Sequence, residues 1–340
     1  MPPLPTEMPG DAAPAGPVAP PRRGIGQWLW GVVGLAVLGL AIWGIGRIAG
    51  EVTWAEVAAD ARAMPVHLFV FAGLSAAASY VVLVGYDWLA LRHLGYRLPL
   101  RTMAAASFGS FTMSHTLGLT VLTGGTVRYR MYTRAGVRPL DIALIIALCG
   151  WTFWLGIVAV AGAGLLIAPD LATPFRTLVP SAERWAGVVL LAGAVGYTAF
   201  AWCYRRPIKL WSYSFTLPDG RETLMQIAIG AVDLAFAGGA LYLLLPDAGV
   251  PGLLTVLTIY AVAMVSGALS HAPGGLGVFE LIIVALLPEA PKAGVLAALV
   301  LFRLIYTYIP FVLGLAVIGW TELAALSVRR AAARRAAAAP

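Results

Sequence analysis

The sequence contains few charged residues and almost no cysteine. Of its 340 residues, 11% are charged and 60% are hydrophobic, whereas a soluble domain has about 25% charged residues. Cys149 and Cys203 both lie in apolar segments, which excludes a disulfide framework and a zinc-type spacing. The sequence also lacks an HExxH motif, a nucleophile elbow and a recognisable ATP site, and no strand-turn-helix pattern surrounds its glycine-rich string. These absences argue against a soluble catalytic domain, and we expect no cofactor and no metal.

Long apolar blocks predict an all-α polytopic membrane protein, because a membrane-spanning helix needs about 20 mainly apolar residues. The stretch 1–27 is rich in proline and alanine and predicts a disordered tail without a cleavable signal peptide. The segment Glu51–Ala63 is too polar to span and predicts a short helix at the outer surface. We predict eight long spans, at about 28–46, 66–91, 102–121, 140–168, 186–204, 222–245, 252–270 and 295–320.

The basic residues obey the positive-inside rule only if two further short segments also cross the membrane. They gather in 22–23, 92–101, 134–138, 205–221 and 329–335. Eight simple crossings would place some of these groups outside. Short crossings at about 126–137 and 276–288 remove the conflict and predict cytoplasmic N- and C-termini. The location of the basic residues in short loops also argues against a nucleic-acid partner.

Two glycine pairs interrupt apolar segments at matching places in the two halves of the chain. Gly124-Gly125 and Gly274-Gly275 each lie 22 residues after the start of a predicted span, at 102 and 252. Broken helices at membrane depth need protein or water as partners, and paired breaks are typical of transporters with inverted repeats. We therefore predict an inverted repeat of 66–168 and 222–320, in which the short segments are half or re-entrant helices. The alternative is that the two pairs fall in register by chance.

Two ionisable residues lie deep in predicted spans. Asp233 is near the middle of 222–245 and Arg303 is deep in 295–320. Charges at membrane depth are costly, and they mark either a pathway or an internal pair. We expect Asp233 and Arg303 to pair with each other or to bind a ligand of opposite charge; a purely structural ion pair is the alternative.

Further candidate residues surround the glycine pairs. Arg128 and Arg130 follow the first pair, and their donor forks suit a phosphodiester; the alternative is that both are cytoplasm-facing charges. Glu280 follows the second pair and predicts either an amine contact or a helix cap. His115 and His271 precede the breaks and are candidates for titration or for an internal hydrogen bond.

Two acidic residues have simpler explanations. Asp87 is at the predicted cytoplasmic end of its span, where an interfacial acid needs no special role. Asp141 follows Pro139 at a predicted helix start, where the helix dipole stabilises it.

Three strings in these regions resemble a known family. Tyr86-Asp-Trp-Leu-Ala-Leu-Arg92, Leu122-Thr-Gly-Gly-Thr-Val-Arg-Tyr-Arg-Met-Tyr132 and Ser270-His-Ala-Pro-Gly-Gly-Leu-Gly-Val-Phe-Glu280 are similar to the membrane domain of the lysylphosphatidylglycerol synthetase/flippase family, the multiple peptide resistance factors. The likeness covers about 25–325. It implies a bacterial inner-membrane protein that moves aminoacylated phosphatidylglycerol to the outer leaflet, where the added amine weakens cationic antimicrobial peptides.

The sequence departs from that family at its C-terminus. Full-length members have a soluble domain that transfers an amino acid from aminoacyl-tRNA to the lipid, whereas this chain ends with a basic tail, 321–340. We therefore expect a lipid translocase and no enzyme. A separately encoded synthetase and a second copy of the chain are candidate partners. The alternatives are a transporter of another small or isoprenoid-linked substrate and a non-transporting scaffold.

In the expected mechanism, basic residues neutralise the lipid phosphate and acidic residues meet the head-group amine. The basic set is Arg128, Arg130 and Arg303, and the acidic set is Asp233 and Glu280. The helix breaks supply backbone dipoles and a place where the two repeats rock against each other.

Overall fold

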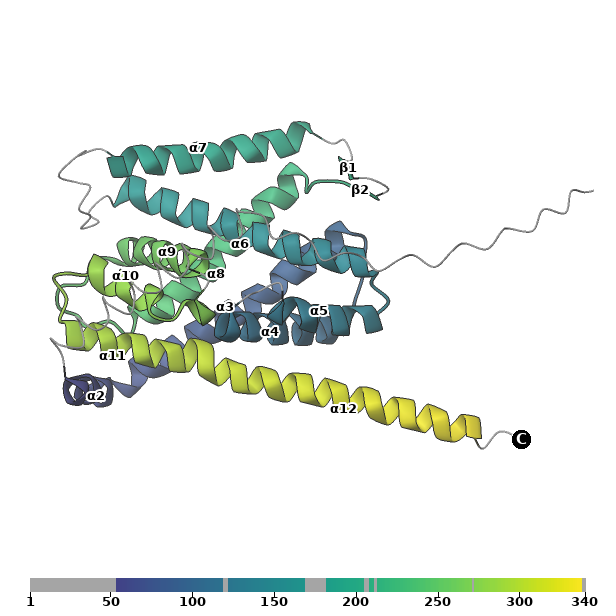
Figure 1. Ribbon diagram of the computed structural model, residues 1–340. Coiled ribbons are helices and arrows are strands. Elements are labelled where there is room, and N and C mark those ends of the chain that lie inside the picture. Colours follow the sequence, from purple (N-terminus) through teal and green to yellow (C-terminus); the bar gives the residue numbers. More distant parts are fainter. Residues whose placement is uncertain are drawn as a thin grey trace, which may run out of the picture.

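The computed structural model describes residues 53–118, 122–168, 182–204, 208–210, 213–270 and 272–337. Within these residues the chain is helical, apart from one short two-stranded hairpin (Figure 1). The expected tail 1–27, the expected first span 28–46 and His271 lie outside the described residues.

The elements follow one another as helices with short connections. The helices of the first half are α2 (Trp54–Ala63), α3 (Val66–His93), α4 (Leu100–Leu117), α5 (Thr123–Arg134), α6 (Pro139–Ile167) and α7 (Ala182–Cys203). The strands β1 (Ile208–Leu210) and β2 (Tyr213–Phe215) come next. The second half contains α8 (Gly220–Tyr242), α9 (Leu253–Leu269), the 3₁₀ turn η2 (Pro273–Gly275), α10 (Val278–Leu286), α11 (Lys292–Phe302), the π-helical η3 (Arg303–Tyr308) and α12 (Ile309–Ala337).

Five helical stretches among the described residues are long and apolar enough to cross a membrane. They are Val66–His93, Pro139–Ile167, Ala182–Cys203, Gly220–Tyr242 and Lys292–Ala324, and they coincide with five of the eight predicted spans. The predicted spans 102–121 and 252–270 became the 18-residue α4 and the 17-residue α9. α4 is less apolar than the five long helices because it contains Arg101, His115 and several serine and threonine residues.

Local sequence explains where several helices begin. Thr53 and Glu56 form a capping box at the start of α2, and Asp219 and Glu222 form another at α8. Proline precedes α3, α4 and α11, and it opens α6, positions where its missing N–H costs no helical hydrogen bond. Within the predicted surface helix 51–63, residues Trp54–Ala63 are thus helical.

Glycine allows the central helices to touch. A Cβ on Gly156 of α6 would lie 2.5 Å from the carbonyl carbon of Gly230 in α8. A Cβ on Gly187 of α7 would lie 2.9 Å from the carbonyl oxygen of Gly162 in α6. Such close backbone approach at small residues is the usual packing mode of membrane helices. It makes α6 the centre of a layer with α7 and α8 on either side (Figure 1).

The first half contains a helical hairpin, α4–α5, whose break differs from the predicted one. α4 ends at Gly118, which has φ of 68°, a conformation that glycine adopts without strain. The pair Gly124-Gly125 is buried inside the first turn of α5 and is itself helical. The prediction that this pair forms the break is therefore wrong. Glycine is required at position 124 for close packing of α5 on α4, because a Cβ there would overlap Ser114 Oγ and lie 2.6 Å from the Ser110 carbonyl oxygen.

The second half contains the hairpin α9–α10, and here the glycine pair does form the break. Gly274 and Gly275 have φ of 59° and 65°. α5 has 12 residues and α10 has 9, lengths of about 18 and 14 Å at 1.5 Å per residue. Each is about half of the ~30 Å hydrocarbon thickness, so neither crosses a membrane alone.

The tips of the two hairpins meet. A Cβ on Gly274 would lie 2.8 Å from the carbonyl oxygen of His115 and 2.9 Å from that of Thr116, both at the end of α4. The α4–α5 hairpin thus approaches from one end of the helix bundle and the α9–α10 hairpin from the other (Figure 1).

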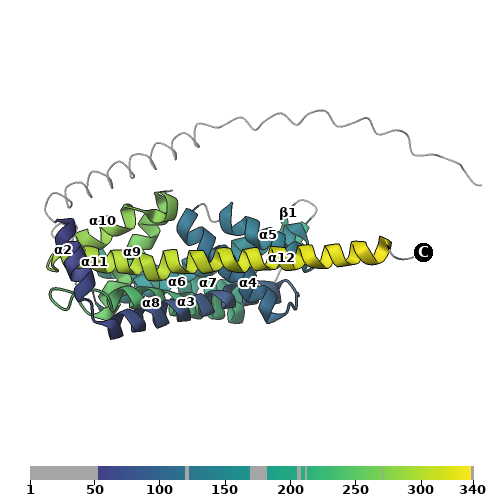
Figure 2. The same cartoon turned by 90° about the horizontal axis from the view of Figure 1, so that it is seen from below.

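The long C-terminal helix has a wide turn next to this meeting point. Pro310 cannot donate to the carbonyl of Tyr306, four residues earlier. η3 replaces the α-helical pattern from Arg303 to Tyr308, and the Tyr80 hydroxyl donates to the free Tyr306 carbonyl at 3.0 Å. α12 then packs against α4 and continues beyond the bundle to Ala337 (Figure 2). Most of the expected tail 321–340 is therefore a continuation of this helix.

Candidate functional site

Arg303 lies at the first position of η3 and links the second helix break to the long C-terminal helix. Its Nε donates to Glu280 Oε1 at 2.7 Å, and its Nη1 donates to the Gly274 carbonyl at 2.8 Å. Its Nη2 is buried and has no hydrogen-bond partner within the described part of the chain. A guanidinium with an unused donor is an incomplete site, because buried donors are normally paired.

Glu280 completes this linkage from α10. Its Oε2 accepts a hydrogen bond from the Gly277 N–H at 2.8 Å. The side chain therefore caps the short helix α10, which was one of the two roles predicted for it. Its other oxygen binds Arg303, whose side chain is 12% exposed and whose guanidinium lies 5.2 Å from the Phe279 ring. The expected pair of Arg303 with Asp233 is therefore wrong: the partner of Arg303 is Glu280.

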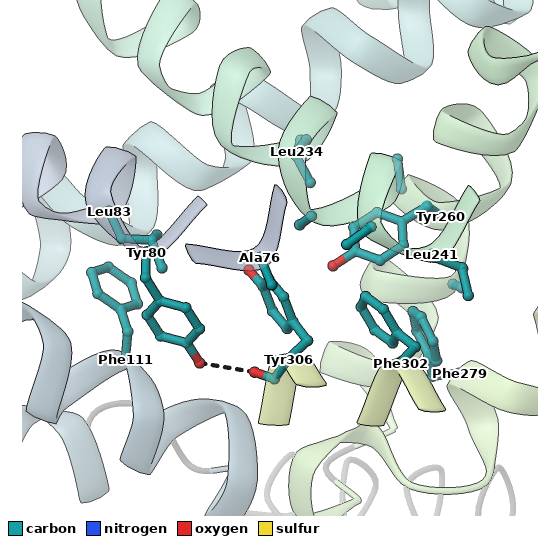
Figure 3. Close-up of a cluster of buried hydrophobic side chains, with 14 of the residues drawn as sticks. Ala76, Tyr80, Leu83, Phe111, Leu234, Leu241, Tyr260, Phe279, Phe302 and Tyr306 are labelled. Carbon is teal, nitrogen blue, oxygen red and sulfur yellow. Dashed lines mark hydrogen bonds between the residues drawn. The ribbon is translucent and has the colours of Figure 1, made fainter. Parts of the chain in front are cut away.

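His115 projects from the last turn of α4 toward the same region. Its ring stacks on Tyr306 at 5.6 Å between centroids, and its Nδ1 lies 3.4 Å from the Tyr80 hydroxyl. That hydroxyl already donates to the Tyr306 carbonyl, so its bond with His115 requires the imidazole to donate from Nδ1. Figure 3 shows Tyr80 and Tyr306 side by side, with Phe111 and Phe302 on either side of them. We name His115, Gly274, Glu280 and Arg303 the tip site.

Asp233 lies beside the tip site but has a different set of partners. It is 4% exposed, near the middle of α8. Ser79 Oγ donates to its Oδ1 at 2.5 Å, and the Tyr86 hydroxyl donates to its Oδ2 at 3.0 Å. Ser79 Oγ also lies 2.9 Å from the hydroxyl of Tyr306. We name Ser79, Tyr86, Asp233 and Tyr306 the Asp233 cluster.

A third polar group holds the α4–α5 hairpin against α3. Nε and Nη2 of Arg128 bind the two carboxylate oxygens of Asp87, each at 2.9 Å, and the Tyr132 hydroxyl donates to Asp87 Oδ1 at 2.8 Å. Asp87 is 0% exposed and Arg128 is 1% exposed, and the guanidinium lies over Phe111. We name Asp87, Arg128 and Tyr132 the α3–α5 clamp.

The clamp corrects two predictions. Asp87 is fully buried and ion-paired, so it does have a specific role, and Arg128 is buried against it and is no exposed cytoplasmic charge. The guanidinium of Arg128 forms a bidentate pair with the Asp87 carboxylate, through the same two donors that a phosphate would bind. Arg128 therefore supports the fold of the site, with its Nε and Nη2 bound to Asp87.

Other predicted residues lie nearer the molecular surface. Arg130 is 56% exposed and pairs with Glu322 of α12 at 3.3 Å, and Arg134 binds the same carboxylate at 2.6 Å. Asp141 is buried in the first turn of α6, where it accepts from the Tyr96 hydroxyl and from Arg138. The hydrogen bond from Arg138 to Asp141 raises the pKa of that guanidinium above its ordinary value. Asp141 thus has direct partners besides the helix dipole.

Sequence reasoning missed the tyrosines of this region. Tyr80 and Tyr86 lie well inside α3, and Tyr306 lies in the middle of the last predicted span. Tyrosine in membrane proteins is enriched at the two interfaces, so hydroxyls in the middle of a span were an available signal. Their partners are Asp233, His115 and a free carbonyl, which the sequence alone does not identify.

Together, these features define a multi-pass helical membrane protein with buried charges where two helix breaks meet. Comparison with known families agrees: residues 31–314 match the family described as the lysylphosphatidylglycerol synthase TM region, and the chain belongs to that family. The resemblance noted in the sequence is confirmed at this level.

Two relatives span most of the chain. The uncharacterized protein slr0712 of Synechocystis is 36% identical over 68% of this chain and 72% of its own length. The inner membrane protein YbhN of Escherichia coli is 31% identical over 70% of this chain and 74% of its own length.

Proposed function

We propose that this protein translocates a polar phospholipid between the leaflets of a bacterial inner membrane, with aminoacylated phosphatidylglycerol as the first candidate. The observation that carries the proposal is Arg303 Nη2, a buried guanidinium donor without a partner among the described residues, located where the two hairpin tips meet. A lipid phosphodiester supplies the acceptor oxygens that this donor lacks.

The tip site also suits the rest of such a head group. Glu280 accepts one hydrogen bond at each carboxylate oxygen, and each oxygen has a second lone pair for the amine of an aminoacyl group. Gly274 and Gly275 leave backbone close to the ligand without a side chain in the way. In this mechanism Arg303 binds the phosphate and Glu280 binds the amine. Arg128 and Arg130 do not contact the lipid, because Arg128 pairs with Asp87 and Arg130 pairs with Glu322.

The arrangement of the hairpins supports transport by alternating access. Each half of the chain has a long helix, a shorter helix, a break, a short helix and a further long helix, in the same order. We propose that these halves form an inverted repeat, and that they rock against each other about the meeting tips. The acyl chains stay in the bilayer while the head group passes the tip site.

The family description and the name of one relative support the lipid class and the location that we propose. The family description refers to a lysylphosphatidylglycerol synthase, and the name of the Escherichia coli relative refers to the inner membrane. We propose that this chain supplies the translocation step and that amino-acid transfer to the lipid is performed by a separately encoded synthetase.

The test is leaflet-specific labelling of lysylphosphatidylglycerol in vesicles that contain the purified protein. An amine reagent that cannot cross the bilayer reports the lipid that reaches the outer leaflet. We expect Arg303→Gln to slow its appearance at least tenfold, because the amide has no charge to offer the phosphate. Arg303→Lys should keep part of the rate.

Arg134→Gln is the matched control, since Arg134 forms an ion pair with Glu322 away from the tips. Thermal unfolding in detergent verifies that each variant is folded. The proposal is wrong if the unmodified protein moves no more lipid than empty vesicles do, or if folded Arg303→Gln moves lipid as fast as the Arg134→Gln control.

A further inference from the structure

We propose that Asp233 is a proton-binding site, and that its protonation is coupled to the movement of the hairpin tips. This inference rests on the proposed transport function for its coupling. The binding of the proton itself stands on the geometry of the Asp233 cluster.

Asp233 is a buried carboxyl group surrounded by neutral donors. Its hydrogen bonds come from the hydroxyls of Ser79 and Tyr86. The two arginines of this region are bound elsewhere, Arg128 to Asp87 and Arg303 to Glu280. Within the described residues, Asp233 therefore has hydroxyl donors and no ion pair, unlike Asp87 and Glu280.

Every element packed around Asp233 offers further uncharged groups. The titratable side chains that face its cluster are Tyr80 from α3, His115 from α4, Cys149 from α6 and Tyr260 from α9, beside the cluster's own Tyr86 and Tyr306. The charged side chain of η3 in this region is Arg303. An ionised carboxylate in such a place costs more than a neutral acid, since no cation offsets its desolvation. Burial thus favours the neutral acid, whereas the two hydroxyl donors favour the carboxylate. We infer that both forms of Asp233 occur, as a proton carrier requires.

A chain of contacts connects Asp233 to the tip site. Ser79 Oγ contacts both Asp233 Oδ1 and the Tyr306 hydroxyl. The Tyr306 ring stacks on His115, and the Tyr306 carbonyl accepts from Tyr80, whose hydroxyl also contacts His115. Tyr306 and Arg303 belong to the same π-helical segment. A change at Asp233 thus acts directly on the segment that holds Arg303.

Protonation changes these contacts in a defined way. One proton binds one carboxylate oxygen, the negative charge disappears, and the new O–H becomes a donor. Ser79 or Tyr86 then accepts the new bond with its hydroxyl oxygen and turns its own hydrogen away from Asp233. If Ser79 turns, its contact with Tyr306 changes as well, and η3 is free to shift against α3. This coupling predicts that a proton gradient drives lipid movement.

Infrared difference spectroscopy during a pH titration tests the binding of the proton. We expect the unmodified protein in detergent to show the carbonyl stretch of a protonated buried acid, with its amplitude dependent on pH. Asp233→Asn, which has the same shape, should lose that band. Asp247→Asn should keep it, because Asp247 is an exposed acid in the loop after α8.

Proteoliposomes with lysylphosphatidylglycerol test the coupling. We expect a pH gradient to accelerate lipid movement by the unmodified protein and by Asp247→Asn, and Asp233→Asn to lose that acceleration. Replacement of sodium by choline should change nothing.

The outcomes separate the two proposals. If the unmodified protein and Asp233→Asn have the same carboxyl bands, or if a sodium gradient and no pH gradient accelerates transport, the proton site is disproved while translocation stands. If the Asp233 band is present but no lipid moves under any gradient, the translocation proposal fails while proton binding stands.

Discussion

Asp87 and Arg128 are the most fully buried ion pair among the described residues. Both carboxylate oxygens bind the guanidinium, and Tyr132 adds a third hydrogen bond. A buried pair is not itself strongly stabilising, but removal of one partner leaves an uncompensated charge and costs about 3–5 kcal/mol. The clamp therefore fixes where α5 lies against α3.

We expect Asp87→Ala to destabilise the protein by about 3–5 kcal/mol, measured as a lower thermal midpoint in detergent. Arg134→Ala is the control, because its pair with Glu322 is partly exposed and such pairs contribute about 0–1 kcal/mol. A double variant, Asp87→Leu with Arg128→Met, removes both charges and should recover much of the loss. Equal midpoints for Asp87→Ala and Arg134→Ala would contradict the structural importance of the clamp.

At this scale the sequence identified charged residues but not their partners. Asp233 and Arg303 are unusual in sequence because charges in spans are rare, and Glu280 is a candidate because it follows the second glycine pair. The partners lie far along the chain: Glu280 is 23 residues from Arg303, and Tyr86 is 147 residues from Asp233. No spacing rule covers such distances. Asp87 was misjudged because its position at a span end has an ordinary explanation, whereas its burial depends on α4 and α5.

The α4–α5 hairpin shows what a glycine contributes at the scale of an element. Gly124 is in ordinary helical conformation, and its lack of a side chain lets α5 approach the backbone of α4. Ser110 Oγ uses this closeness to donate to the Gly124 carbonyl at 2.9 Å. The same contact sets the position from which Arg128 reaches Asp87.

We expect Gly124→Ala to destabilise the protein, because the new methyl group would lie 2.6 Å from the Ser110 carbonyl oxygen, which belongs to the backbone and cannot turn away. Gly150→Ala is the matched control: Gly150 is helical, and a Cβ there meets nothing within 4 Å. The control should be neutral or stabilised by up to about 1 kcal/mol, as alanine favours helices. Thermal midpoints of both variants in detergent decide the matter. A Gly124→Ala protein as stable as the control would show that α4 and α5 are less tightly packed.

Element boundaries were easier to predict than the cause of the breaks. Proline and capping residues mark most helix starts, and five apolar blocks became long helices. The two glycine pairs look alike in sequence, yet one packs inside a helix and the other turns the chain with positive φ. The difference lies in how each pair meets α4: Gly124 packs against Ser110 and Ser114 along that helix, whereas Gly274 lies against the carbonyls at its end. The hairpin of β1 and β2 in the basic loop 205–221 had no alternating apolar pattern that predicts strands.

On the scale of the whole molecule, the connections fall into two groups at opposite ends of the bundle (Figures 1 and 2). At one end, the loop after α8 touches the loop after α10, since a Cβ on Gly249 would overlap the Glu289 carbonyl. At the same end, α2 packs against α11. At the other end, His93 binds Glu222 and the Thr216 carbonyl, and Tyr96 binds Asp141. The positive-inside rule predicts the first group to be outside and the second group to be cytoplasmic. Charge counting and packing thus divide the loops in the same way.

This division predicts opposite labelling of two single cysteines. In a background of Cys149→Ala and Cys203→Ser, Thr133→Cys is exposed near the end of α5, and Glu289→Cys is exposed after α10. In intact cells, a thiol reagent that cannot cross the membrane should label Glu289→Cys and leave Thr133→Cys unlabelled. In inverted membrane vesicles the result should reverse.

Ala263→Cys is the control for access, because Ala263 is 0% exposed and should react only after denaturation. Since α5 and α10 are too short to cross alone, opposite labelling of residues 133 and 289 means that each hairpin returns to the end from which it entered. Labelling of both positions from the same side would contradict hairpins of opposite direction. It would also remove the structural basis for an inverted repeat, whatever lipid the protein moves.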